Sequence, residues 1–147
     1  MQGSVWLQAN PWLLAAAALS LLGAAIHIAC IFGGPDWYRA LGAGEAMAQA
    51  AARGSPVPGL LTAGIAVILL IWAAYALSSA ALIPRLPLLA LAMLAITAVL
   101  AGRGLFIFVP DGWRPDLSLM FKFWSSLFVL AMALCFAIGT WQRWQQL

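Results

Sequence analysis

The sequence predicts an all-α integral membrane protein with four transmembrane helices in an up-down antiparallel bundle. Hydrophobic residues fill 65% of the 147 positions, charged residues fill only 7%, and the mean hydropathy is +1.01. A soluble domain needs roughly a quarter of its residues charged to cover its surface, so lipid must cover much of this chain. Four apolar stretches are also each long enough to cross a bilayer, which takes about 20 residues.

Prolines stand at the expected starts of all four spans, because proline is tolerated in a first helical turn but breaks a helix interior. The first run follows Pro11, carries no Lys or Arg before it, and is longer than the apolar core of a signal peptide. We therefore expect the whole chain, 1–147, to form one transmembrane domain. The spans are predicted at about residues 12–33, 57–82, 86–109 and 117–141.

The connections differ in length. Little more than Ile83–Arg85 joins the second span to the third, and such a short link predicts an antiparallel hairpin. The longer segment between the first two spans predicts a short amphipathic helix over about 36–53 that lies in the membrane interface. Glu45, Gln49 and Arg53 form its polar stripe, and the run Gly42-Ala43-Gly44 is expected to bend the helix or split it in two.

Tryptophans and basic residues indicate which ends of the helices share a membrane surface. The tryptophans form two belts, one near the termini and one near the long loops: Trp6, Trp12, Trp141 and Trp144, and Trp37 and Trp113. The long-loop side carries more of the seven basic residues, namely Arg39, Arg53, Arg103, Arg114 and Lys122, against Arg85 and Arg143. The positive-inside rule then places the long loops in the cytoplasm and the termini outside. The bias to Ala, Leu, Gly and Arg suits a bacterial inner membrane.

Several classes of function and site are disfavoured. The basic residues are scattered, whereas nucleic-acid binders gather them on one face, so no nucleic-acid partner is expected. Cys30 and Cys135 fall about 20 Å apart in depth, too far for a disulfide, and we interpret both as small buried apolar residues. One histidine and two distant cysteines do not build a Cys/His metal site, and no motif assigns a catalytic residue or a cofactor.

Three basic side chains share one level beneath the long-loop surface. His27, Arg103 and Lys122 each stand six residues inside the end of a predicted span, about 9 Å deep at a rise of 1.5 Å per residue. Thr62 falls in the same layer, and Ser125 belongs to a polar stripe of the fourth span with Ser118, Lys122 and Ser126. The predicted ligand-binding residues are His27, Glu45, Thr62, Arg103, Lys122 and Ser125.

For four of these residues the sequence leaves more than one interaction open. Arg103 and Lys122 either extend to the lipid headgroups, pair with Glu45 or Asp116, or bind a ligand. His27 is too short to reach the headgroups, and its expected partner is a Ser, a Thr or a carbonyl on a neighbouring helix. Glu45 either folds over the mouth of the bundle to meet Arg103 or faces water.

The layout of four spans resembles that of small bacterial membrane families such as the DoxX-like proteins, but no motif carries a function from them. Three hypotheses remain. The favoured one is a non-enzymatic accessory subunit or a binder of an anionic lipid or amphiphile in an intrabundle pocket, since Arg matches such oxygens. The others are a membrane enzyme or redox component acting on a lipidic or quinone-like substrate, and a homodimeric transporter or channel. The expected partners are the bilayer, a lipidic or anionic small molecule, and a second copy or another membrane subunit.

Overall fold

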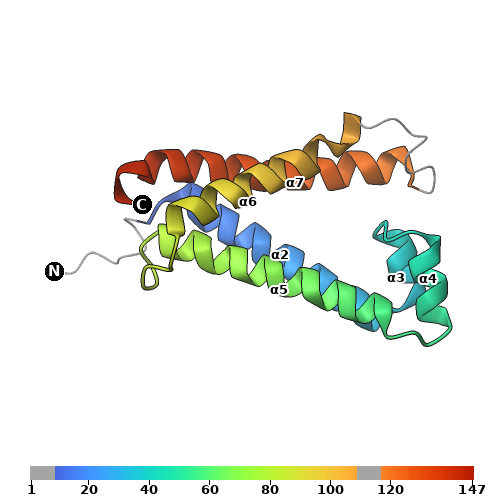
Figure 1. Cartoon of the computed structure of the whole chain (residues 1–147). Helices are drawn as coiled ribbons and strands as arrows, with labels where there is room; N and C mark the ends of the chain where they lie inside the picture. Colours follow the sequence, from blue (N-terminus) through green and yellow to red (C-terminus); the bar gives the residue numbers. More distant parts are fainter. Residues whose placement is uncertain (1–8, 109–116) are drawn as a thin grey trace.

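A computed structural model of the chain describes residues 9–108 and 117–147 (Figure 1). Its helices are α2 (Pro11–Gly33), α3 (Pro35–Ala40), α4 (Glu45–Ala52), α5 (Val57–Ser79), α6 (Leu89–Gly104), η1 (Leu105–Phe108), α7 (Leu119–Arg143) and η3 (Trp144–Gln146). The helices α2, α5 and α7 are long and apolar enough to cross a membrane, and α6 is a shorter apolar helix. The all-α prediction is confirmed, and the three long helices indicate an integral membrane protein. Predictions that concern Trp6, Asp111, Trp113, Arg114 and Asp116 fall outside the described residues.

Polar caps and prolines define where the helices begin. The side-chain oxygen of Asn10 accepts hydrogen bonds from the backbone N–H groups of Trp12 at 2.9 Å and Leu13 at 3.2 Å, and Pro11 occupies the first turn of α2. The Ser118 hydroxyl caps α7 by accepting from the N–H of Phe121 at 3.1 Å. Both helices therefore begin within two residues of their predicted starts.

The link between α5 and α6 is longer than predicted. The α5 helix ends at Ser79 and α6 begins at Leu89, so the three-residue hairpin turn is wrong. The Ser78 hydroxyl donates to the carbonyl oxygen of Pro84 at 3.1 Å and accepts from the N–H of Leu86 at 3.0 Å. These bonds hold a folded loop, and its prolines cannot donate a backbone hydrogen bond to extend either helix.

The segment between α2 and α5 forms two helices rather than one helix over 36–53. The break lies at Leu41–Gly44, where Gly42 and Gly44 have φ values of 71° and 94°, a conformation that glycine adopts without steric cost. The N–H of Ala43 bonds to the carbonyl oxygen of Tyr38 at 2.9 Å and closes the turn. The glycine run thus splits the helix, one of the two outcomes expected.

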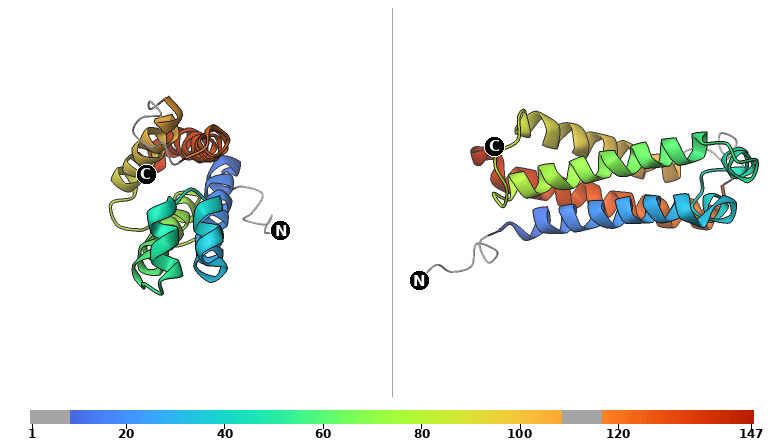
Figure 2. Two further views of the ribbon diagram at one scale, coloured as in Figure 1. Left: turned by 90° about the vertical axis from the view of Figure 1, so that its right-hand side faces the viewer. Right: turned by 90° about the horizontal axis from the view of Figure 1, so that it is seen from below.

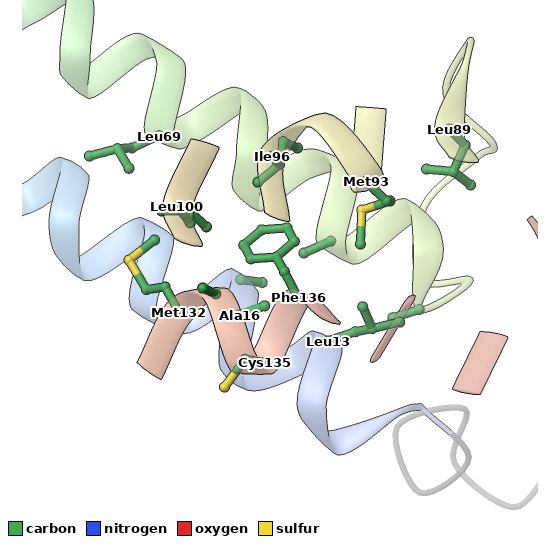
Figure 3. Packing of buried hydrophobic residues seen from close by; sticks show 14 of the residues in the cluster. Leu13, Ala16, Leu69, Leu89, Met93, Ile96, Leu100, Met132, Cys135 and Phe136 are labelled. Atoms are coloured by element: carbon green, nitrogen blue, oxygen red, sulfur yellow. The ribbon is translucent and has the colours of Figure 1, made fainter. Parts of the chain in front are cut away.

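The long helices form two tight pairs. In Figure 1, α2 lies along α5 and α6 lies along α7, and the pairs meet mainly through α2 and α7, whereas α5 and α6 touch over few residues. Gly139 lets α7 approach α2 closely, since a Cβ on it would lie 2.5 Å from Cδ2 of Leu13. Phe136 is fully buried at the centre of the core between the pairs, next to Met93, Ile96 and Met132 (Figure 3).

The two pairs diverge toward the end of the bundle that carries α3 and α4 (Figures 1 and 2). A second, small apolar cluster lies there, built on the buried residues Cys30, Tyr38 and Ala48. The turn between α3 and α4 also packs against the first turn of α7, because a Cβ on Gly42 would overlap the ring of Phe121. The short helices are therefore attached to both halves of the bundle at this end.

Candidate functional site

The most buried charged side chain among the described residues is Lys122, near the start of α7. It is only 2% exposed, so its ammonium group does not extend outward to the headgroups, and the snorkelling interpretation is wrong for this residue. Ser126 follows one turn later on the same face and is 1% exposed. Its hydroxyl is buried and has no hydrogen-bond partner among the described residues. One face of α7 therefore brings a cation and an unsatisfied hydroxyl into the protein.

Arg103 joins this polar face from the end of α6. Its Nη2 donates to the Ser125 hydroxyl at a long 3.4 Å, and that hydroxyl donates to the carbonyl oxygen of Lys122 at 3.3 Å. Arg103 is exposed, so its guanidinium group lies at the edge of the bundle rather than inside it. Three of the predicted site residues, Arg103, Lys122 and Ser125, are thus brought together at the α6–α7 contact.

His27 and Thr62 lie on α2 and α5, away from the Arg103–Ser125 hydrogen bond. The Nδ1 atom of His27 lies 2.7 Å from the carbonyl oxygen of Gly23, one turn earlier in α2, so the expected bond to a neighbouring helix is wrong. A carbonyl only accepts, so Nδ1 carries the proton in this bond. Thr62 is buried on α5 at 7% exposure. Within the described ranges, no hydrogen bond links either residue to Arg103 or Lys122.

Glu45 does not reach Arg103. Its carboxylate accepts two bonds from Arg39, from Nε at 2.9 Å and from Nη2 at 3.1 Å, and Nη1 of Arg39 bonds to Asp36 at 2.9 Å. The Arg39 guanidinium, followed by a hydrogen bond from Gln49, lowers the pKa of Glu45 below its ordinary 4.5. The Glu45 side chain is 52% exposed, in agreement with the alternative in which it faces water.

Ser126 is the residue that sequence reasoning underrated. It belongs to the polar stripe of the predicted fourth span but is not one of the predicted site residues. The signal was its spacing of four residues from Lys122, which places both on one helix face. The interpretation of Cys30 and Cys135 as buried residues agrees with the structure, where both are buried and free. Among the described residues, no group of three or more His, Cys, Asp or Glu side chains could hold a metal ion.

Comparisons with known proteins give the chain no relative. No protein-family model matches it, and neither a curated protein nor a solved structure does.

Proposed function

We propose that this chain is a four-span membrane protein that binds the anionic head of a lipid or other amphiphile at the α6–α7 contact, with Lys122 as the buried cation. The observation that carries the proposal is the pairing of a 2% exposed lysine with the buried, unsatisfied hydroxyl of Ser126 on one face of an apolar helix. Placing an ionisable group within a membrane segment costs a few kcal/mol, so such groups are retained for pairing or for function.

The length of α6 supports a fourth span. Its 16 residues continue directly into the four residues of η1. At rises of about 1.5 Å and 2.0 Å per residue the two helices together cover about 32 Å. A bilayer hydrocarbon core is about 30 Å thick, so α6 with η1 is long enough to cross it.

The α3–α4 unit has the side chains of an interfacial segment. Tyr38 and Ala48 are buried toward the bundle, while Trp37 is 46% exposed, as suits a ring at the headgroup level. The exposed polar residues Arg39 and Glu45 belong on the water side. Because this end of the bundle carries more basic residues, we place the α3–α4 unit on the cytoplasmic side of a bacterial inner membrane. Labelling an Arg53→Cys protein from each side of the membrane tests the orientation.

The local chemistry favours an anion as the ligand. Arg103 brings positive charge to the α6–α7 contact through its bond to Ser125, and Lys122 adds a buried ammonium group near the start of α7. The guanidinium of Arg103 presents several donors in a planar fork that matches phosphate or carboxylate oxygens. Ser126 adds a hydroxyl one helical turn after Lys122 in α7. The apolar helices around these groups suit an acyl or prenyl chain, so an anionic amphiphile fits better than a free anion.

The test is ligand retention by Lys122→Met protein, purified and measured by native mass spectrometry. A charge-assisted hydrogen bond is worth about 1.5–3 kcal/mol, so its loss should weaken binding at least about tenfold. Arg53→Met removes a positive charge from the exposed end of α4 and is the matched control, with binding expected to stay unchanged. Arg103→Met serves as a second variant should Lys122→Met fold poorly. Undiminished ligand in both Lys122→Met and Arg103→Met would refute the proposal.

A further inference from the structure

A hollow lies at the end of the bundle opposite to α3 and α4, beside the end of α7. It has a volume of about 200 Å³ and is bordered by the end of α5, the α5–α6 loop and the end of α7. Ser79, Arg85 and Arg143 contribute its polar lining, and Ile83, Leu89 and Leu147 contribute apolar walls. The hollow therefore combines polar and apolar surface.

Two guanidinium groups converge on this hollow. Nη1 of Arg85 donates to the backbone oxygen of Gln146 at 3.3 Å, and Nη1 of Arg143 donates to the side-chain oxygen of the same residue at 2.6 Å. Gln146 holds the two arginines beside each other through bonds to neutral amide oxygens. A guanidinium has five N–H donors, and the bond to Gln146 engages only one of those of Arg85.

A buried hydroxyl adds a third polar group. Ser79 lines the hollow and is 5% exposed, and its hydroxyl has no hydrogen-bond partner among the described residues. Buried hydroxyls are normally bonded, and an exception calls for an explanation such as a bound group. The two acidic side chains that the structure describes, Asp36 and Glu45, lie on α3 and α4 at the far end of the bundle.

Exposed tryptophans place the hollow at the level of the headgroups. Trp141 is 83% exposed and Trp144 is 49% exposed, on either side of Arg143 in the sequence, and Trp12 at the start of α2 is 40% exposed. Tryptophan rings gather at the membrane–water interface. The arginines therefore stand where lipid phosphates lie, if the helices span the membrane as proposed above.

We propose that this hollow binds a phosphate group, supplied by the headgroup of an anionic phospholipid. The guanidinium groups of Arg85 and Arg143 donate to the phosphate oxygens, and Ser79 turns its hydroxyl toward them. The walls formed by Ile83 and Leu89 contact the first part of an acyl chain. The inference rests on the membrane placement in the proposed function but not on the Lys122 site.

The experiment is native mass spectrometry of the full chain, delipidated in a zwitterionic detergent. Phosphatidylglycerol is compared with phosphatidylcholine of the same acyl chains, and inorganic phosphate is added as a competitor. Arg85→Gln and Arg143→Gln should each weaken phosphatidylglycerol binding about tenfold through loss of charge-assisted bonds. Arg53→Gln, the same change at the other end, should leave binding unaltered.

The outcomes separate the source of the phosphate and the two proposed sites. Preference for phosphatidylglycerol that survives millimolar phosphate supports a lipid ligand, whereas displacement by phosphate supports the same site with a free anion as its ligand. The comparison is repeated in Lys122→Met protein, where a persistent effect of Arg85→Gln assigns binding to this hollow even if the Lys122 proposal fails. Equal binding by wild type and both arginine variants would overturn the inference.

Discussion

Two adjacent serines at the end of α5 should respond in opposite ways to the same substitution. Ser78 and Ser79 are 6% and 5% exposed. The Ser78 hydroxyl bonds to Leu86 and Pro84 of the α5–α6 loop, whereas the Ser79 hydroxyl has no partner within the described ranges. Replacing either serine by alanine removes one oxygen and creates almost no cavity. The comparison therefore isolates the hydrogen bonds.

The expected difference follows from what each substitution leaves behind. Ser78→Ala strands the half-buried N–H of Leu86, at about 1–3 kcal/mol, while the exposed carbonyl of Pro84 bonds to water at little cost. Ser79→Ala removes a hydroxyl that gains no hydrogen bond in the fold. Its effect should lie within about 0.5 kcal/mol of zero or be slightly stabilising.

Reversible unfolding in mixed micelles of dodecylmaltoside and SDS, without added lipid, measures both free energies of unfolding. Tryptophan fluorescence supplies the signal, since the chain has eight tryptophans. The reasoning predicts that Ser78→Ala unfolds at clearly lower SDS than Ser79→Ala. Equal midpoints, or a larger loss for Ser79→Ala, would show that the loop does not depend on the Ser78 hydrogen bonds.

Two further predictions concern the α2–α7 contact and the α3–α4 salt bridge. Gly139→Ala should destabilise the bundle by about 1–3 kcal/mol in the same SDS titration. The new Cβ would lie 2.5 Å from the Leu13 side chain and 3.3 Å from the Leu13 backbone nitrogen. The control is Gly64→Ala, because a Cβ at that position meets nothing within 4 Å. The pKa of Glu45 should be below 4.5 by carboxyl NMR and should rise toward 4.5 in Arg39→Gln protein. Folding lowers the pKa of Glu45, so the salt bridge contributes its full stabilisation of α3–α4 at pH values above the pKa that Glu45 has in the unfolded chain. This contribution is lost as the pH falls through the lower pKa of the folded protein. An unchanged Glu45 titration in Arg39→Gln would contradict the assignment.

Helix positions followed from the sequence more readily than the turns. Proline and a cap residue stand together at Asn10-Pro11, and that local chemistry predicts the start of α2. The α5–α6 loop offers no such signal, because its turns use Ala81 and Leu88 at φ values of 61° and 54°. Neither residue type favours a left-handed conformation. The loop depends instead on the Ser78 hydrogen bonds, which a search for apolar runs does not detect.

The position of a side chain along its helix was predictable from the sequence, but its hydrogen-bond partner was not. Counting residues places Lys122 inside the bundle end, and its polar stripe gives the face. Arg39 and Glu45 stand six residues apart, which in one continuous helix would put them about 120° apart in azimuth. The break at Gly42–Gly44 turns the second helix back and joins them, so the salt bridge exists only because the predicted single helix is divided.

The residues that stabilise the bundle are largely separate from those of the proposed binding sites, and Phe136→Ala tests this. Phe136 is fully buried between the helix pairs, and Phe→Ala in a soluble core costs about 3–5 kcal/mol. Lipid is as apolar as the core, so in a bilayer mainly the lost packing remains and the cost should fall below that range. Phosphatidylglycerol binding by folded Phe136→Ala protein should match wild type, because Arg85, Arg143 and Lys122 are unchanged. If the folded Phe136→Ala protein lost phosphatidylglycerol binding, the core would be coupled to the binding sites. Single-site variants could then not be used to assign the residues of those sites.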